Sequence, residues 1–305
     1  GVSFSPTVLG EETRERIKLL KDGNVLLLEN VRFYKEEEEC DMKFAREIAS
    51  MGDIFVNDAF GTAHRKHATT YGLARLLPNA IGFLMEKELT NLDTILNNPK
   101  RPFVVVLGGS KVGTKVKILE RFIEKADTIL IGGAMAYTFL KAKGFDVGAS
   151  KVDDENIEVA TNVLNKASEL GKKILLPIDH VCIKGKDPHP IVVTNLRGNM
   201  VGYDIGPRTV KYYAKEIDGA GEIFWNGPVG MYENANFRNG TRSIAEAIAN
   251  SKAHSSAGGG DTVAMINLFN LGKKFNYLST GGGATLEYLE EGTLPAIEVI
   301  QEKIQ

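Results

Sequence analysis

Short apolar runs alternate with amphipathic stretches along almost the whole chain, and this alternation limits the possible folds more than any other feature of the sequence. At 157–170, for example, apolar residues recur at helical spacing directly before the apolar run at 173–176. Strands that alternate with helices form βα units and parallel sheets. We expect strands at 25–28, 54–56, 103–107, 128–131, 173–176, 222–225, 253–257 and 275–278.

The length of the chain indicates two domains, because 305 residues exceed what one hydrophobic core usually supports. One amphipathic helix is predicted at 85–98, before Pro99, and it separates two arrays of βα units. The sequence therefore predicts an α/β fold with two doubly wound, Rossmann-like parallel-sheet domains. We assign 1–84 to the first domain, 85–98 to an interdomain helix and 99–283 to the second domain.

The composition is that of a soluble globular protein, with 43% hydrophobic and 25% charged residues and a formal net charge of −2. This balance argues against nucleic-acid binding, which usually needs a strongly basic domain. No apolar stretch reaches transmembrane length and the N-terminus carries no secretory signal, so we expect no membrane partner and a cytoplasmic protein. Cys40 and Cys182 fit neither a disulfide framework nor a CxxC metal site, and we expect buried, inert thiols.

Three glycine-rich segments follow expected strands late in the chain: WNGPVGMYE (225–233), GGGDT (258–262) and STGGGAT (279–285). Glycines at the carboxyl end of a strand let backbone N–H groups approach phosphate oxygens, and a following helix N-terminus adds positive potential. One such segment could simply be a tight βα turn, but three in succession favour an anion-binding cleft. The sequence thus predicts that the chain handles nucleotide phosphates.

Two carboxylates stand in these segments. Glu233 ends the first one and could accept two hydrogen bonds from a ribose diol, although an ordinary surface glutamate is the alternative. Asp261 is a hard oxygen ligand of the kind that Mg²⁺ takes together with phosphate oxygens. The alternative for Asp261 is a helix N-cap before a helix that starts at Thr262, and both roles can hold at once.

Lys111 and Lys115 follow the expected strand at 103–107 and a Gly-Gly turn. Their i, i+4 spacing would place two ammonium groups on one face of a helix turn. An arbitrary pair of this kind is usually a solvated basic face, and the residue order is wrong for a P-loop. Their position after a strand and a Gly-Gly turn, where sites form, argues against a merely solvated face. The acidic run at 36–39, by contrast, is expected to be a solvated helix start or loop.

Taken together, these segments closely resemble the phosphoglycerate kinase family. The resemblance also runs, in family order, through VLLLENVRF (25–33), VNDAFGTAHR (56–65), GFLMEKE (82–88), VLGGSKVGTK (106–115) and IGGAMAYTFLK (131–141). The motifs are long and cover essentially the whole chain. The resemblance implies a monomeric glycolytic enzyme that transfers a phosphoryl group reversibly between 1,3-bisphosphoglycerate and MgADP, giving 3-phosphoglycerate and MgATP.

The resemblance also assigns residues on the nucleotide side. It makes Lys111, Lys115 and Gly283 catalytic, with the lysines at the nucleotide phosphates and the phosphoryl group in transfer. It makes Asp261 the ligand of Mg²⁺. The implied nucleotide-binding set is Gly109, Ser110, Lys115, Gly133, Gly202, Asn226, Pro228, Glu233, Gly259, Gly260, Asp261 and Thr262.

On the first domain the resemblance points to Arg32, Arg65 and His64 as phosphoglycerate-binding residues. Guanidinium groups suit a substrate with a carboxylate and a phosphate, because they bind either group in bidentate fashion. We expect His64 to be structural rather than a general base, since phosphoryl transfer to a carboxylate removes no proton. The segment 284–305 is implied to return to the first domain. Closure of the two domains would then bring the substrates together.

The sequence departs from the family at its start, where an aspartate–asparagine–arginine segment and a histidine–glycine–arginine segment are not found. The resemblance therefore implies that roughly ninety residues of the first domain, or about three βα units, are not among residues 1–305. The run at 25–28 reads as a strand buried on both faces, which needs neighbours that residues 1–305 do not supply. We expect a chain of these residues alone to be unstable in about its first eighty residues, or to lack kinase activity.

Two other functions stay open. The chain could be a nucleotide-binding but catalytically inactive fragment of the same enzyme, which binding without turnover would reveal. It could also be a nicotinamide-dependent dehydrogenase on a similar fold. The lack of a G-x-G-x-x-G segment followed by an acidic residue about 20 positions later argues against the dehydrogenase.

Overall fold

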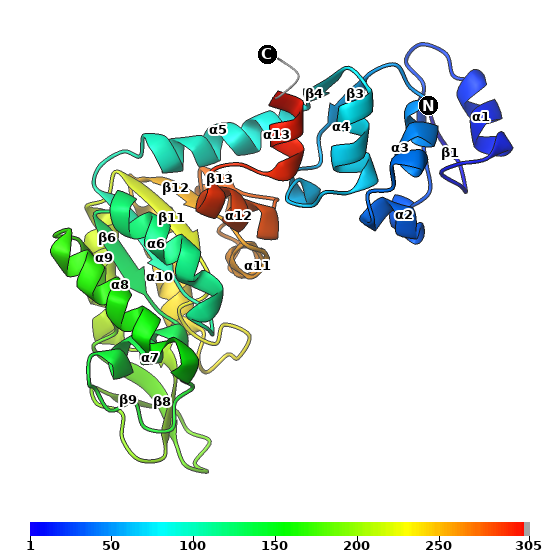
Figure 1. Cartoon of the computed structure of the whole chain (residues 1–305). Helices are drawn as coiled ribbons and strands as arrows, with labels where there is room; N and C mark the ends of the chain where they lie inside the picture. The colour runs from blue at the N-terminus through cyan, green and yellow to red at the C-terminus, as the bar shows by residue number, and fades with distance from the viewer. Residues whose placement is uncertain (302–305) are drawn as a thin grey trace. The chain divides into compact units, whose positions relative to one another are not determined.

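The computed structural model describes residues 1–301, with side chains described up to Ile300. The chain forms two compact units, which we call unit 1 (Gly1–Thr90 and the segment from Glu291) and unit 2 (Asn91–Glu290). The predicted helix at 85–98 is helix α5 (Phe83–Asn97), which carries residues of both units (Figure 1). None of the helices in the described part is long and apolar enough to cross a membrane.

Unit 2 is built on a six-stranded, all-parallel sheet in the order β13-β12-β11-β5-β6-β7. In order along the chain these strands read 3-2-1-4-5-6 across the sheet, which is the Rossmann arrangement. The α/β fold class predicted from the sequence is therefore confirmed. The strands are β5 (Phe103–Leu107), β6 (Thr128–Ile131), β7 (Lys173–Leu175), β11 (Glu222–Asn226), β12 (His254–Ala257) and β13 (Tyr277–Leu278). Each coincides with a predicted strand to within two residues.

Helices cover both faces of this sheet (Figure 1). Helices α9 (Pro207–Asp218), α10 (Asn239–Asn250) and α11 (Gly260–Leu268) contribute buried side chains to one core, together with Trp225 of β11. On the other face, α6 (Val116–Lys125) inserts Phe122, whose ring centroid lies 5.9 Å from that of Phe103 and 5.4 Å from that of Phe224. Both faces of the sheet are thus buried by helices, and the loops at the carboxyl ends of its strands remain accessible.

A three-stranded antiparallel sheet is inserted between β7 and α9, in the order β10-β8-β9. It consists of β8 (His180–Lys184), β9 (Ile191–Val193) and β10 (Met200–Ile205). These strands were not predicted from the sequence, because the apolar runs of β8 and β9 are only three residues long and polar Asp204 interrupts that of β10. The remaining elements of unit 2 are α7 (Met135–Ala142), α8 (Ile157–Glu169), α12 (Gly283–Glu291) and the short helices η4 (Gly113–Lys115), η5 (Asp154–Asn156) and η6 (Gly272–Lys274).

Unit 1 contains two separate pairs of parallel strands. β1 (Val2–Phe4) pairs with β2 (Val25–Leu27), and β3 (Phe55–Asn57) pairs with β4 (Asn79–Ile81). From the carboxyl-terminal segment, Val299 and Ile300 pack with Ala74 in one of its cores. The other elements are α1 (Glu11–Lys18), α2 (Lys35–Glu38), α3 (Met42–Ala49), α4 (Leu73–Leu76), α13 (Pro295–Gln301), η1 (Val31–Phe33), η2 (Phe60–Thr62) and η3 (Ala68–Gly72).

The apolar run at 25–28 forms a strand, as predicted, and within the described residues it lacks the neighbours that would bury both of its faces. In β2, Val25 is 54% exposed and Leu27 is 59% exposed, and their partner Val2 in β1 is 73% exposed. The apolar run does form a strand, but two paired strands with one flanking helix cannot cover both faces. Leu19 and Leu20, after α1, are also exposed.

Tyr213 provides a test of how unit 2 closes the carboxyl edge of its sheet. Its buried hydroxyl donates to the carbonyl oxygen of Ile131 at 2.6 Å, and the carbonyl oxygen of Leu175 lies within hydrogen-bond distance at 3.0 Å. We expect Tyr213→Phe to lower the free energy of unfolding by about 1–3 kcal/mol, because it removes the partner of buried carbonyl groups. The matched Tyr212→Phe change, at a residue 39% exposed, should cost less than about 0.5 kcal/mol. Urea unfolding monitored by circular dichroism measures both, and equal losses would contradict the assignment.

Candidate nucleotide and substrate sites

A cavity of about 370 Å³ opens at the carboxyl ends of the strands of unit 2. Loops after four strands contribute to its wall: Gly109 after β5, Gly133 after β6, Pro228 after β11 and Asp261 after β12. The strand order reverses between β5 and β11, and in doubly wound sheets the crevice at that reversal is where ligands bind. The cavity therefore lies where the topology itself predicts a binding site.

Backbone hydrogen bonds tie the loops of the cavity to one another. The N–H of Gly109 donates to the carbonyl oxygen of Pro228 at 2.9 Å, and the N–H of Gly133 donates to that of Val229 at 2.8 Å. Gly133 has φ +66°, and a Cβ there would lie 2.6 Å from the carbonyl oxygen of Gly109. Only glycine fits this position, because a side chain would force the two loops apart.

The structure gathers seven of the predicted nucleotide residues around this cavity. They are Gly109, Ser110, Gly133, Gly202, Pro228, Glu233 and Asp261. Other predicted nucleotide residues do not line the cavity but form hydrogen bonds that hold its loops together. The side-chain amide of Asn226 donates to the carbonyl oxygen of Gly258 at 2.8 Å, and the buried hydroxyl of Thr262 accepts from the N–H of Gly227 at 2.8 Å. Gly259 and Gly260 form the turn into α11.

Asp261 lies in the first turn of α11 and not at its cap. The N-cap residue is Gly259, and no side-chain hydrogen bond caps this helix within the described chain. The predicted alternative role of Asp261 as an N-cap is therefore wrong, because α11 starts at Gly260, one residue before the aspartate. Its exposed carboxylate lines the cavity instead.

The donor set at Asp261 fits a nucleotide-bound Mg²⁺. Among the residues that the structure describes, no group of three or more His, Cys, Asp or Glu side chains could hold a metal ion. Mg²⁺ in nucleotide enzymes commonly takes one or two carboxylates and completes its shell with phosphate oxygens and water. One exposed carboxylate beside a helix N-terminus is consistent with that arrangement.

Lys111 and Lys115 do not share a helix face, so this part of the prediction is wrong. Lys115 is the last residue of η4, α6 begins only at Val116, and Lys111 lies in the preceding loop, exposed. The ammonium group of Lys115 is half-buried and donates to the side-chain oxygen of Asn226. Burial lowers the pKa of Lys115 from its ordinary value of 10.5 to about 8, and the charges of Glu290 and Asp261 partly oppose this shift.

The three residues predicted to be catalytic lie outside the cavity wall. Lys111 and Lys115 follow the β5 loop that supplies Gly109 and Ser110, and Gly283 starts α12 with its backbone exposed. Each of these groups follows the carboxyl end of a strand of the same parallel sheet.

Sequence reasoning missed several residues of the cavity. Among the described residues, Lys151 is the only lysine or arginine that lines it, and Tyr203 and Met231 add apolar surface. Lys151 stands between α7 and η5, in a segment without a glycine-rich turn or an apolar run that could have marked it. Tyr203 belongs to β10, one of the strands that the pattern did not reveal.

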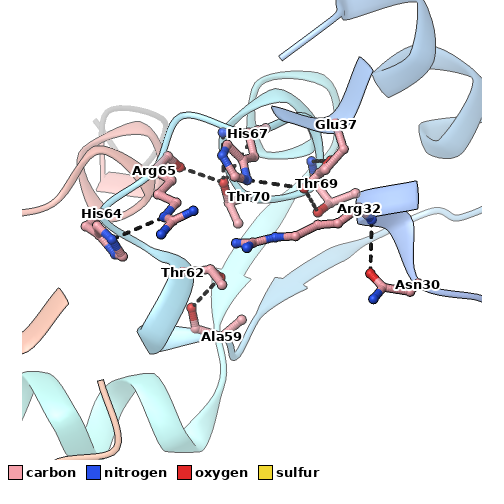
Figure 2. A network of polar contacts seen from close by, with 10 residues as sticks. All are labelled: Asn30, Arg32, Glu37, Ala59, Thr62, His64, Arg65, His67, Thr69 and Thr70. Atoms are coloured by element: carbon pink, nitrogen blue, oxygen red, sulfur yellow. Dashed lines mark hydrogen bonds and ion pairs between the residues drawn. The ribbon is translucent and has the colours of Figure 1, made fainter. Parts of the chain in front are cut away.

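In unit 1, Arg32 lines a cavity of about 260 Å³ beside β3. Figure 2 shows the side chains of Arg32 on η1 and Arg65 after η2 extending toward one another. The Nε of Arg65 donates to Nε2 of His64 at 3.3 Å. Among the described residues neither arginine forms an ion pair with a carboxylate. Arg65 and His64 do not line the cavity itself, but two unpaired guanidinium groups that face one space leave their charge available to an anion.

The acidic run at 36–39 is not uniformly solvated, because Glu37 is buried. Its carboxylate accepts hydrogen bonds from the N–H of Thr69 at 2.9 Å and from the hydroxyl of Thr69 at 2.6 Å. Nδ1 of the buried His67 lies 3.8 Å from the same carboxylate (Figure 2). This network anchors α2 to the start of η3, next to the arginines. Of the two cysteines, Cys182 is buried as expected, whereas Cys40 is half-buried.

The strand order and the cavity at its reversal place unit 2 among the α/β proteins that bind nucleotides on a Rossmann-like sheet. Comparison with known proteins narrows this class. The family model described as phosphoglycerate kinase matches residues 1–292. A phosphoglycerate kinase of Borreliella burgdorferi is 48% identical over 297 residues, which cover 96% of this chain and 76% of the relative. One of Dictyoglomus turgidum is 46% identical over 300 residues, or 97% and 76% of the two chains.

Solved structures agree with these relatives. A phosphoglycerate kinase from Coxiella burnetii superimposes with a TM-score of 0.91 at 39% identity and covers 100% of this chain and 78% of that one. The enzyme from Pyrococcus horikoshii gives a TM-score of 0.85 at 34% identity, over 98% and 78% of the two chains. The chain belongs to the phosphoglycerate kinase family, and it is a phosphotransferase of the nucleotide-binding, α/β class.

The buried environment of Lys115 leads to a prediction about its titration. Because burial lowers its pKa to about 8, one lysine should lose its proton between about pH 7 and pH 9. The lysines can be reductively methylated with a ¹³C label, and their resonances followed by NMR across this range. One resonance should titrate there, and Lys115→Arg should remove it. A wild-type protein without such a resonance would show that the ammonium group is solvated.

Proposed function

We propose that unit 2 binds MgADP or MgATP in its cavity, that unit 1 binds 3-phosphoglycerate or 1,3-bisphosphoglycerate at Arg32 and Arg65, and that the chain transfers a phosphoryl group reversibly between them. The observation that carries this proposal is the cavity at the strand-order reversal, lined by loop glycines and two carboxylates. Membership in the phosphoglycerate kinase family supplies the identity of the reaction.

The cavity offers different chemistry to each part of a nucleotide. Gly133 and Gly202 leave backbone surface open, which suits a flat base, and Tyr203 and Met231 add apolar contact. We assign the ribose to Glu233, because a carboxylate can accept hydrogen bonds from both hydroxyls of a diol. The phosphates would then extend toward the N-terminus of α11, where backbone N–H groups and the helix dipole favour negative charge.

Asp261 is the residue that we propose holds Mg²⁺ with the nucleotide phosphates. The bound metal would neutralise phosphate charge and orient the phosphate chain. The protein itself contributes the carboxylate of Asp261, in the first turn of α11. The negative charge of this carboxylate raises the pKa of Lys115 and so helps to keep that lysine protonated. A metal-bound phosphate chain and a neighbouring ammonium group would thus share one anionic site.

We propose that Lys115, Lys111 and the N-terminus of α12 at Gly283 stabilise the phosphoryl group in transfer. Phosphoryl transfer asks for positioning and charge neutralisation more than for covalent chemistry. A half-buried ammonium group interacts with a phosphoryl oxygen more strongly than a solvated one, because water screens it less. A bound anion should also raise the pKa of Lys115 again, so the charge is retained when it is needed.

The substrate side rests on the paired arginines of unit 1. A bidentate guanidinium group matches a carboxylate or a phosphate, and 3-phosphoglycerate carries one of each. Arg32 is fixed locally, because its N–H donates to the side chain of Asn30 at 3.0 Å. Since Arg32 belongs to unit 1 and Lys115 to unit 2, transfer requires the units to bring their substrates together.

A nucleotide-binding chain without catalytic activity is the second candidate. Nucleotide titration beside a coupled assay for phosphorylation of 3-phosphoglycerate distinguishes the two, because binding without turnover selects the inactive chain. For the active protein, we expect Lys115→Ala to reduce turnover well over tenfold, since one preorganised charge at a transition state contributes about 3 kcal/mol. Lys211→Ala, an exposed lysine of α9, is the matched control and should leave turnover unchanged. Normal turnover in Lys115→Ala would reject the assignment.

The Mg²⁺ assignment has its own test. We expect Asp261→Ala to weaken ADP binding about tenfold or more in the presence of Mg²⁺ and only slightly in its absence, because the carboxylate acts through the metal. Isothermal titration calorimetry with and without Mg²⁺ measures both affinities. Asp218→Ala at the end of α9 serves as the control for removal of an exposed carboxylate. Equal losses under both conditions would assign Asp261 a purely structural role.

A further inference from the structure

A second cavity, of about 360 Å³, lies in unit 2 beyond the carboxyl end of β7, and residues of α7 and of the antiparallel sheet line it. It shares no described lining residue with the nucleotide cavity. Its inner wall is apolar and comes from Leu140 of α7, Leu176 and Pro177 after β7, and Leu196 after β9. This volume and lining are typical of a small-molecule site.

One buried polar side chain lines this apolar space. His180 of β8 lines the cavity and is only 4% exposed. Its Nδ1 is fully enclosed and has no hydrogen-bond partner in the described chain, whereas Nε2 is not among the fully enclosed, unpartnered atoms. Because His180 lines the cavity and keeps a small exposed fraction, we take Nε2 as the nitrogen that a molecule in the cavity can reach.

The environment of His180 defines the chemistry of a ligand. Burial lowers the pKa of His180 to about 4, with the charge of Asp179 acting in the opposite direction, so the imidazole is neutral at pH 7. In a neutral imidazole one nitrogen donates and the other accepts, and a hydroxyl group can match either. A charged ligand would lose its hydration against the leucines, whereas an aromatic ring would bury apolar surface there.

We propose that this cavity is a second small-molecule site, which takes a neutral aromatic alcohol whose hydroxyl group hydrogen-bonds with Nε2 of His180 while its ring packs against Leu140, Leu176 and Leu196. The exposed Lys143 and Asp146 stand at its mouth and leave the inner wall uncharged. The cavity occupies the same carboxyl edge of the sheet as the nucleotide cavity, but at the edge strand β7 instead of the strand-order reversal.

Helix α7 connects the second cavity with the first. It follows Ala134, which lines the nucleotide cavity, and Leu140 near its end lines the second one. Between them the ring of Tyr137 lies with its centroid 5.6 Å from that of His180, and a Cβ at Gly202 would collide with its hydroxyl. A ligand at His180 should therefore change nucleotide affinity, and the nucleotide should change the ligand's affinity by the same factor. This coupling depends on the proposed nucleotide site, whereas binding of a ligand in the second cavity does not depend on it.

The test uses the whole chain with methyl-labelled leucines and two probes, 4-ethylphenol and ethylbenzene, which differ by one hydroxyl group. We expect 4-ethylphenol to bind saturably and to shift the methyl resonances of Leu140, Leu176 and Leu196. Ethylbenzene should bind about five- to tenfold more weakly, because it lacks the hydrogen bond. His180→Phe keeps an aromatic ring but no nitrogen, and it should abolish the preference. Thr194→Trp, at an exposed residue of the wall, should block both probes.

Several outcomes would overturn the proposal. The site does not exist if neither probe binds saturably, or if binding of 4-ethylphenol leaves the methyl resonances of Leu140, Leu176 and Leu196 unshifted. If 4-ethylphenol keeps its preference in His180→Phe, the imidazole is not the recognition group and water alone satisfies it. Circular dichroism shows whether each variant is folded. An unchanged affinity for 4-ethylphenol in saturating MgADP would disprove the coupling alone, and a separate MgADP titration shows whether the nucleotide site itself is present.

Discussion

The hydrogen bonds between the loop after β5 and the loop after β11 are the interaction on which the site of unit 2 depends. Parallel strands bring these loops to one edge of the sheet. Where the strand order reverses, the two loops lead away in opposite directions and leave a crevice between them. The bond from the N–H of Gly109 to the carbonyl oxygen of Pro228 joins the two loops at the point where they would otherwise separate. Gly133 closes against the same atoms, and no side chain fits there. Backbone hydrogen bonds therefore hold the loops of the cavity together, and side chains such as Glu233 and Asp261 add charged groups to its wall.

Such a frame makes it possible to bury a charge that the protein would not otherwise tolerate. The folded state lowers the pKa of Lys115 from 10.5 to about 8, so between these values the unfolded chain binds more protons than the folded one. Stability contributed by this group therefore rises with pH from about 8 to 10.5, and below about pH 8 the buried ammonium group opposes folding. A phosphate that binds beside it would reverse this penalty. Part of the binding free energy of an anion would thus come from compensating the desolvation of the Lys115 ammonium group, which folding has already imposed.

Much of unit 2 could be predicted from sequence because its signals are local and mutually consistent. Apolar runs such as 103–107 are long, uninterrupted and followed by glycines, so strand, turn and cavity wall all follow from one pattern. The antiparallel strands were missed because the apolar run of β8 is only three residues long, between His180 and Lys184, and Asp204 interrupts that of β10. With β10, Tyr203 was missed as part of the cavity wall. Periodicity also could not place a helix boundary to within two residues, and a shift of two residues decides whether Asp261 caps α11 or lies in its first turn.

The same limits explain the errors at Lys115 and in unit 1. An i, i+4 spacing implies a common face only inside an α-helix, and η4 ends before α6 begins. Glu37 sits in an acidic run that looks solvated, yet Thr69, far along the chain, supplies the hydrogen bonds that allow its burial. An apolar run such as 25–28 indicates that a strand has apolar side chains to bury, whereas the exposure of those side chains depends on which elements pack against the strand. Local pattern thus predicts the element, and long-range contacts decide the environment. The chemistry of Lys115, Glu37 and His180 depends on that environment, because burial, and not residue type, sets the behaviour of each.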